Sequence, residues 1–280
     1  MEFFFREVYI LHLETGNMTS VTNQNGQLSY QVFGTGEEIL LAFHGFGQSG
    51  KIFEEWAQVI GSQFTIYAFD LFYHGNSMRP FQNLSKTEWE EWIQLFLAKE
   101  GFARFSILGY SLGGRFAIST AILFGERVNK LFLVAPDGIF LTVWFKLATT
   151  PGLKLLFKYF VMHPDRLERM LAFNERSRMI NRYVADFARK EMGDLENRKR
   201  VYRSWNFFKT LGYTKKALVR HFSKAPYQKT LIVGDKDHII KPSGILPIIA
   251  KTNAFQVHHL PLKHHQLAKP DVAKLLLPEA

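Results

Sequence analysis

Short apolar runs alternate with amphipathic segments along most of the chain. Six β-like runs occupy the first half, and they are FFFREVYIL, LSYQVF, ILLAFH, FTIYAFDL, FSILGYS and KLFLVAPD. From the third run onward, helical patterns lie between them, as in GKIFEEWAQVIG, LSKTEWEEWIQLFLAKEG and GGRFAISTAILFGERV. Such alternation is typical of an α/β protein with a mostly parallel central sheet and helices on both faces. No helix separates the first two runs, so we expect an antiparallel hairpin to begin the sheet.

This alternation stops between about residues 139 and 226. The span has helical patterns rich in aromatic and basic residues, and it contains no strand pattern. After it, KTLIVGD, SGILPIIAKT and AFQVHHLP return to the order strand, helix, strand. The pattern therefore predicts a core domain formed by residues 1–138 and 227–280, with residues 139–226 as a helical insertion.

One helix of the predicted insertion has a marked apolar stripe. The segment LKLLFKYFVM places Leu153, Leu156, Phe157 and Phe160 on one helical face. Packing of the insertion onto the core is the favoured interpretation. The alternatives are that the stripe lines an apolar acyl pocket or touches a membrane surface.

Charge is distributed unevenly along the 280 residues, which carry a formal net charge of +10. Residues 139–226 hold 19 Lys and Arg against 7 Asp and Glu, a net of +12, and the remainder has a net of −2. A basic surface attracts nucleic acid, anionic lipid or an acidic substrate. The basic residues are scattered through helical sequence, which favours a solvated helical surface. We expect no nucleic-acid partner.

Cysteine is absent, which excludes disulfides and thiolate metal sites and is compatible with a reducing compartment. The N-terminal stretch carries Glu2, Arg6 and Glu7, so it does not have the pattern of a secretory signal. No apolar run approaches the roughly 20 residues that span a bilayer. We therefore expect a cytoplasmic protein without a transmembrane segment.

A glycine-rich loop early in the chain matches a motif of dinucleotide-binding proteins. The stretch HGFGQSGKI satisfies G-x-G-x-x-G between a strand and a helix, and Asp70 lies 20 residues after Gly50. This is the layout of a dinucleotide-binding unit. That scheme does not require His44 before the first glycine, nor the turn DLFYHGNS that begins at Asp70. A dinucleotide-binding oxidoreductase is thus an alternative of low weight.

The stretch GYSLGG places Gly109 and Gly113 two residues on either side of Ser111. In a G-x-S-x-G turn the serine adopts a strained backbone conformation, and residues two positions away approach each other closely. The turn exposes the serine Oγ. The helix that begins at Leu112 directs its free N–H groups at the same space. Because a strand precedes the motif and a helix follows it, we predict that Ser111 is a nucleophile.

A nucleophilic serine requires a general base and an acid that orients it. The expected places are the loops after later strands, in the order serine, acid, histidine. Asp237 follows one such strand, and Asp235 and Asp137 are the alternative acids. His264 and His265 lie on the loop after the last strand.

We expect the other histidines and carboxylates to take no part in catalysis. His44 and His74 are interpreted as bracing residues of their loops. The histidines and carboxylates form no compact metal-ligand motif, so we expect neither a metal nor a cofactor.

On these motifs the chain resembles the α/β-hydrolase-fold serine hydrolases over nearly its whole length. HGFGQSG resembles the H-G-x loop of that family, which implies an oxyanion hole formed by the backbone N–H groups of Phe46 and Leu112. DLFYHGNS resembles the D-x-x-G-H-G-x-S loop, with Tyr73 at the usual glycine position. LIVGDKD resembles the acid-bearing turn, and its matching position is Asp237.

The histidine position departs from the family pattern. KHH stands where the family has Gly-His, so the base stays open between His264 and His265. The step from Pro261 resembles the P-x-x-G-H spacing and favours His265. In this family an insertion at the place of residues 139–226 commonly forms a cap, or lid, over the active site.

The resemblance implies a hydrolase that needs no cofactor and cleaves a carboxylic ester or a related acyl or C–C bond. Its triad would be Ser111, Asp237 and His265, and its substrate a small molecule with an apolar acyl part or an anionic part. The serine argues against family members that use a carboxylate nucleophile, such as haloalkane dehalogenases and epoxide hydrolases. The other alternative is a non-catalytic binding protein on the same fold.

Overall fold

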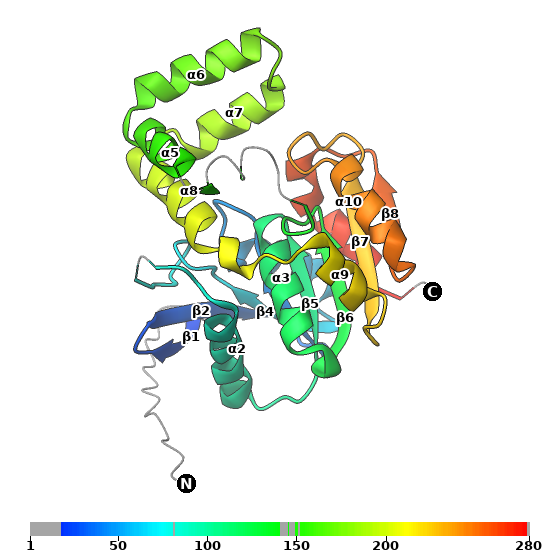
Figure 1. Ribbon diagram of the computed structural model, residues 1–280. Helices are drawn as coiled ribbons and strands as arrows, with labels where there is room; N and C mark the ends of the chain where they lie inside the picture. The colour runs from blue at the N-terminus through cyan, green and yellow to red at the C-terminus, as the bar shows by residue number, and fades with distance from the viewer. Residues whose placement is uncertain (1–17, 81, 141–144, 146–148, 151, 279–280) are drawn as a thin grey trace.

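The structure, a computed structural model, describes residues 18–80, 82–140, 145, 149–150 and 152–278. One sheet of eight strands runs through these residues, in the order β1-β2-β4-β3-β5-β6-β7-β8 (Figure 1). Its strands are β1 (Met18–Asn23), β2 (Gly26–Phe33), β3 (Glu38–Phe43), β4 (Phe64–Phe69), β5 (Phe105–Tyr110), β6 (Val128–Val134), β7 (Gln228–Gly234) and β8 (Gln256–Leu260).

Strands β3 to β8 are parallel, whereas β2 pairs antiparallel with both β1 and β4. This confirms the predicted α/β class with a mostly parallel sheet. The sheet begins with an antiparallel hairpin, but its first strand is not the one that was predicted. The pattern did not predict this strand. Its sequence MTSVTN has only two apolar residues, Met18 and Val21, among polar ones. The run FFFREVYIL, for which a strand was predicted, lies outside the described residues.

The helices of the core follow the predicted positions closely. Ser85 caps its helix as expected, because its Oγ accepts the backbone N–H of Glu88 at 3.0 Å. Figure 1 shows α2, α3 and α9 on the near side of the sheet. The helices are α1 (Phe53–Ile60), α2 (Lys86–Glu100), α3 (Leu112–Leu123), α9 (Lys215–Phe222) and α10 (Pro242–Ile249), and the 3-10 segments η5 (His264–Ala268) and η6 (Pro270–Leu276) end the described chain.

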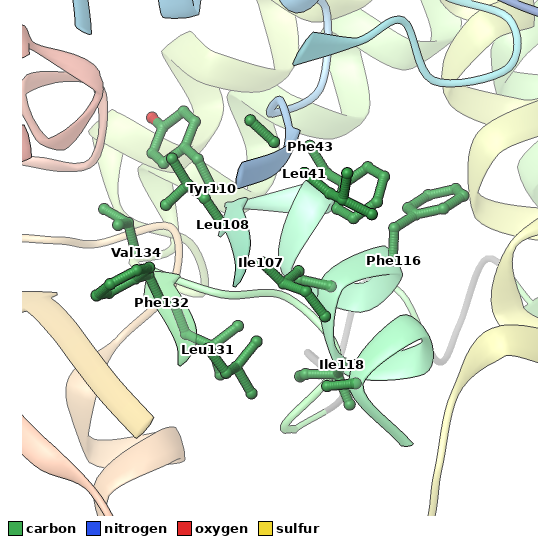
Figure 2. Close-up of a cluster of buried hydrophobic side chains, with 14 of the residues drawn as sticks. Leu41, Phe43, Ile107, Leu108, Tyr110, Phe116, Ile118, Leu131, Phe132 and Val134 are labelled. Carbon is green, nitrogen blue, oxygen red and sulfur yellow. The ribbon is translucent and has the colours of Figure 1, made fainter. Parts of the chain in front are cut away.

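The main hydrophobic core lies between the central strands and the helices that cover them. Every residue of β5 is buried, as expected for a strand covered on both faces. Figure 2 shows side chains of β3, β5, β6 and α3 packed together in this region. The labelled residues are Leu41, Phe43, Ile107, Leu108, Tyr110, Phe116, Ile118, Leu131, Phe132 and Val134.

A second helical layer stands apart from the sheet in Figure 1. It consists of α5 (Leu153–Met162), α6 (Pro164–Arg176), α7 (Arg182–Glu191) and α8 (Leu195–Phe207). These helices enclose a small hydrophobic cluster of their own, made of Val161, Leu167, Leu171, Ile180, Ala185, Met192 and Val201. We call α5–α8 the cap helices.

The described residues of the predicted insertion form helices joined by turns, and they contain no strand. Side chains from Phe208 onward, including Leu211 and Leu218, pack into the main core rather than into the cap cluster. The division into core and cap domains at residues 139 and 226 stays a prediction. Burial places its second boundary nearer to Phe208.

The apolar stripe of α5 does not pack onto the core as a whole. Phe157 and Phe160 pack against the cap cluster, whereas Leu153 and Leu156 are exposed. Among the described residues, none of the helices has the length and apolar character needed to cross a bilayer.

Candidate active site

Ser111 lies at the junction between β5 and α3 and has φ 50° and ψ −118°. Few residues other than glycine adopt a positive φ, and holding one there costs about 1–3 kcal/mol. Three backbone hydrogen bonds hold the turn. The Ser111 N–H donates to the carbonyl of Val134 at 3.0 Å, and the Ser111 carbonyl accepts from Gly114 at 2.9 Å and Asp137 at 2.8 Å. The predicted strained elbow is therefore present.

The glycines of the motif are required by close packing of the backbone. A Cβ atom on Gly109 would lie 2.5 Å from the Cβ of Ala117 and 2.7 Å from the carbonyl oxygen of Gly113. A Cβ atom on Gly113 would lie 1.9 Å from the carbonyl oxygen of Phe43. Helix α3 can begin directly against β3 and β5 only because these side chains are absent.

A chain of hydrogen bonds joins Ser111 to a histidine and an aspartate. The Nε2 atom of His264 lies 2.9 Å from Ser111 Oγ, and its Nδ1 atom lies 2.6 Å from Asp237 Oδ2. The other carboxylate oxygen of Asp237 accepts the backbone N–H groups of Ile239 and Ile240, each at 2.8 Å. This buried carboxylate favours the tautomer with a proton on Nδ1, which leaves Nε2 free to accept the serine proton.

The favoured histidine has to be corrected. His264 faces Ser111, whereas His265 is exposed and forms no hydrogen bond with it. Both belong to the 3-10 turn η5, in which neighbouring side chains point in different directions. Besides Asp237, Tyr110 also holds His264 in this orientation. Its hydroxyl donates to the carbonyl of His264 at 3.0 Å, and its ring stacks on the His264 ring at a centroid distance of 5.5 Å.

The two alternative acids have other partners. Asp137 forms a bidentate ion pair with Arg115, with N–O distances of 2.8–3.0 Å. Asp235 lies near the surface with its Oδ1 atom 2.9 Å from Nδ1 of His259. The sequence had marked both carboxylates by their places at strand ends, but these contacts leave Asp237 as the acid next to His264.

The carboxylate of Asp70, the feature that favoured dinucleotide binding, is buried and already in use. Its Oδ1 atom accepts the backbone N–H of Gly50 at 2.8 Å, and its Oδ2 atom accepts that of Asn76 at 2.7 Å. It thus ties the glycine loop to the turn that follows β4. A carboxylate held in this way is not available for a ribose hydroxyl, so the geometry argues against the dinucleotide alternative.

His44 and His74 brace the same two loops, as the sequence predicted. His44 is fully buried, its Nδ1 donates to the carbonyl of Gly45 at 2.6 Å, and its Nε2 accepts the N–H of Leu71 at 3.0 Å. Burial lowers the pKa of His44 to about 4, so the ring is neutral at pH 7. Burial also lowers the pKa of His74, whose ring packs edge-on against Phe46.

Tyr73 stands where the resembling family has glycine, and its backbone shows why glycine is usual there. Its φ is 66°, in the left-handed region that side chains other than glycine rarely adopt. The Tyr73 ring stacks on Phe208 at a centroid distance of 5.6 Å, and its hydroxyl donates to the carbonyl of Pro80 at 3.0 Å. These contacts hold the residue in the strained conformation.

The backbone N–H groups of Phe46 and Leu112 were predicted to form an oxyanion hole. Phe46 lies in the loop after β3, and Leu112 is the first residue of α3. Among the described residues, neither N–H donates a hydrogen bond to a protein acceptor. The two groups are therefore available to a ligand, and their role as an oxyanion hole stays a prediction.

A cavity of about 490 Å³ lies over Ser111. Its floor includes Tyr110 and His264, and its roof comes from α7 and α8 of the cap helices. Tyr183 of α7 closes one side, where its ring stacks on that of His238 at 5.0 Å with an interplanar angle of 4°. The sequence did not mark this contact, because it joins a cap helix to the loop after β7.

A second hollow and the possibility of a metal site were also considered as binding sites. Around α2, the end of α3 and α9 lies a larger hollow of about 1460 Å³, but its walls include no serine paired with a histidine. In the described part of the chain, His, Asp and Glu residues do not gather into a group of three that could hold a metal ion.

The sequence is similar to those of several curated proteins over part of its length. An uncharacterised protein of Mycobacterium tuberculosis is 30% identical over 125 residues, which are 44% of this chain and 36% of that protein. A pimeloyl-[acyl-carrier protein] methyl ester esterase of Photobacterium profundum is 32% identical over 113 residues, 40% of this chain and 42% of the relative. The match thus spans about two fifths of the length of these relatives.

Solved structures show the same fold over almost the whole chain. An esterase from Thermogutta terrifontis has a TM-score of 0.68 at 14% identity, and the match covers 92% of this chain and 96% of the esterase. The haloalkane dehalogenase DbeA from Bradyrhizobium elkani has a TM-score of 0.64 at 15% identity, with 92% and 94% covered. At these identities the likeness concerns the fold.

Residues 38–267 match the family described as alpha/beta hydrolase fold, which is more than half of the chain. The strand order, the elbow at Ser111 and the structural relatives agree with that match. The chain therefore belongs to the α/β-hydrolase fold family.

Proposed function

We propose that the protein is a serine hydrolase that cleaves a carboxylic ester, or a related acyl bond, of a small molecule. The observation that carries this proposal is the hydrogen-bond chain from Ser111 through His264 to Asp237, which lies under a cavity. The curated relatives from Photobacterium and Aliivibrio are named methyl ester esterases, and their names support an ester as the substrate class.

The geometry suits acyl transfer in two steps. Ser111 Oγ attacks the ester carbonyl while His264 Nε2 takes the hydroxyl proton, and the carbonyl oxygen becomes an oxyanion. The N–H groups of Phe46 and Leu112 would stabilise this oxyanion, and the loss of one such donor typically costs about 10²–10³ in kcat. His264 then gives its proton to the leaving alcohol, and an acyl-Ser111 intermediate remains.

Water completes the reaction by the reverse roles. His264 removes a proton from the water molecule that attacks the acyl-enzyme, and it returns that proton to Ser111 Oγ as the acid leaves. Throughout, Asp237 orients the imidazole and stabilises its charged form. The hydrogen bonds from Ile239 and Ile240 to Asp237 hold the carboxylate in place for this task.

The test is the Ser111→Ala variant, with hydrolysis of short p-nitrophenyl esters as the assay. We expect kcat to fall by about 10³-fold or more, because the nucleophile is lost. A fluorophosphonate probe should label the wild-type protein at Ser111, which peptide mass spectrometry can locate. Ser223→Ala, at an exposed serine outside the cavity, is the matched control. Unchanged hydrolysis by Ser111→Ala would refute the proposal.

A further inference from the structure

The cavity over Ser111 has a cationic wall. Lys236 and Lys263 line it from the core, and Lys190 and Arg200 line it from the cap helices. Elsewhere several cations near carboxylates form ion pairs, as Arg115 does with Asp137. In the part of the chain that the structure describes, none of the four cavity cations forms an ion pair.

The carboxylates of the same wall do not balance this charge. Asp186 is engaged by Arg189, with an N–O distance of 3.2 Å. Glu191 is half-buried, and its burial raises the pKa of the carboxyl group, although the nearby charges of Lys190 and Arg200 oppose this shift. Asp237 lies behind the wall, where its oxygens are occupied by His264 and two backbone N–H groups. Four cations therefore face the cavity against one partly desolvated carboxylate and one that is already paired.

Two of the cations are positioned by the backbone that carries the candidate triad. Lys236 directly precedes Asp237, and Lys263 directly precedes His264. The two loops are joined where the N–H of Lys236 donates to the carbonyl of Leu262 at 3.2 Å. Both lysines thus lie on one rim of the cavity that contains Ser111.

This rim also contacts the cap helices. The Nζ atom of Lys263 lies 4.9 Å from the centre of the Tyr183 ring, which stacks on His238. A cation held over an aromatic ring keeps its charge available to a further partner on its open side. The ammonium group is thereby positioned between core and cap, at the edge of the space that a substrate would fill.

We propose that the substrate carries an anionic group, a carboxylate or a phosphate, at the end remote from the scissile ester, and that Lys236 and Lys263 bind this group. Lys190 and Arg200 add positive potential from the opposite wall. Ammonium groups pair as compact point charges with both kinds of anion, and charge-assisted hydrogen bonds are stronger than neutral ones. This inference rests on the proposed esterase function and narrows its substrate class.

The experiment compares esters that share the p-nitrophenyl leaving group and differ in the group at the remote end. Mono-p-nitrophenyl adipate carries a carboxylate, methyl p-nitrophenyl adipate is its neutral counterpart, and p-nitrophenyl 5-phosphonopentanoate carries a phosphonate. In the wild-type protein we expect kcat/KM to be about tenfold higher for at least one anionic ester than for the neutral one. The better of the two anions identifies the group as carboxylate or phosphate.

The double variant with Lys236→Ala and Lys263→Ala should lower the anionic-to-neutral ratio of kcat/KM by about tenfold, mainly through KM. Two single variants at Lys263 test the role of its charge, with Lys236 unchanged in both. Lys263→Arg keeps the charge, so it should retain more of the preference for anionic esters than Lys263→Ala does. Lys215→Ala combined with Lys216→Ala on α9 also removes two charges, from an exposed site outside the cavity, and is the control. Thermal melting checks that each variant is folded.

The outcomes separate this inference from the function on which it rests. If neither anionic ester is preferred by the wild type, or if the double variant lowers all three kcat/KM values equally, the anion site is refuted. Hydrolysis of the neutral ester that depends on Ser111 would then still support the esterase. Absence of any hydrolysis that depends on Ser111 would refute the function itself.

Discussion

The core and the cap helices differ in how completely their apolar side chains are buried. In the core, all six residues of β5 are buried between helices, and Trp56, Trp89 and Trp92 are fully buried. The cap cluster has seven buried apolar residues. Among the described residues, nine of the eleven exposed large hydrophobic side chains lie in or between the cap helices, and they are Leu153, Leu155, Leu156, Tyr159, Met162, Phe173, Met179, Tyr183 and Leu195.

Polar contacts join the cap helices where buried apolar side chains are few. In the cap, Arg189 pairs with Glu168, Glu175 and Asp186, and the buried Arg198 donates to three backbone carbonyls. Exposed ion pairs contribute little stability, with a median of about 0–1 kcal/mol. The comparison indicates that the core determines whether the chain folds and positions Ser111, His264 and Asp237, whereas the cap helices line the cavity above them.

The largest effect is expected in the core, at the candidate base. His264→Ala should lower kcat for ester hydrolysis by about 10³-fold or more, because Ser111 then has no proton acceptor. His265→Ala changes a neighbouring side chain that does not contact Ser111, so its loss should be far smaller. Steady-state kinetics of the two variants measures the difference. Equal losses, or a larger loss at His265, would contradict the hydrogen-bond geometry.

The next largest effect is expected on stability, when the same Leu→Ala truncation is made in the core and in the cap helices. Leu108→Ala, at a fully buried position of β5, should lower the free energy of unfolding by about 2–5 kcal/mol. Leu155→Ala on α5 truncates a side chain that is 72% exposed, and it should change the free energy by about 0.5 kcal/mol or less. Urea unfolding curves provide both values. A loss at Leu155 that matched the one at Leu108 would show that the cap face is covered in solution.

A smaller effect is the pH dependence that comes from the core histidines. Because burial lowers the folded-state pKa of His44 to about 4, the unfolded chain binds more protons between about pH 4 and the ordinary value near 6.5. The free energy of unfolding should therefore fall as pH is lowered through that window. His44→Asn should flatten the slope, as measured by urea unfolding at several pH values.

The matched control for this slope is His163→Asn, at an exposed position of the cap. It leaves the buried His44 in place, so the part of the slope that comes from His44 should remain. If both variants flattened the slope equally, its source would not lie in the buried loop brace.

The smallest effect is expected at a cap carboxylate. Burial raises the folded-state pKa of Glu191 above its ordinary value of 4.5, so the charged form is destabilising and this part of the stability is lost as pH rises above about 4.5. Glu191→Gln should raise Tm at pH 7 by about 1 °C, and the two proteins should converge near pH 4. A variant that melts lower than wild type at pH 7 would show that the charged carboxylate has a stabilising partner.

Much of the fold and part of the site could be predicted from local pattern. Continuous apolar runs and capped amphipathic segments indicated the parallel sheet, and Ser85 at the start of α2 is one signal that the structure confirms. The elbow at Ser111 was equally local, since the spacing of Gly109 and Gly113 encodes a close backbone approach. Strand β1 was missed, because its mostly polar residues gain their structure from pairing with β2.

What the sequence by itself determined is thus most of the helices and strands and the strained turn, because these depend on neighbouring residues. The tertiary structure alone decided that His264 faces Ser111, because the contacts that hold its ring come from Tyr110 at the end of β5 and Asp237 after β7. It also decided that Asp70 serves as a brace. In the same way, Lys236 and Lys263 share one rim because two distant loops pair, and no periodicity along the chain reports such a contact.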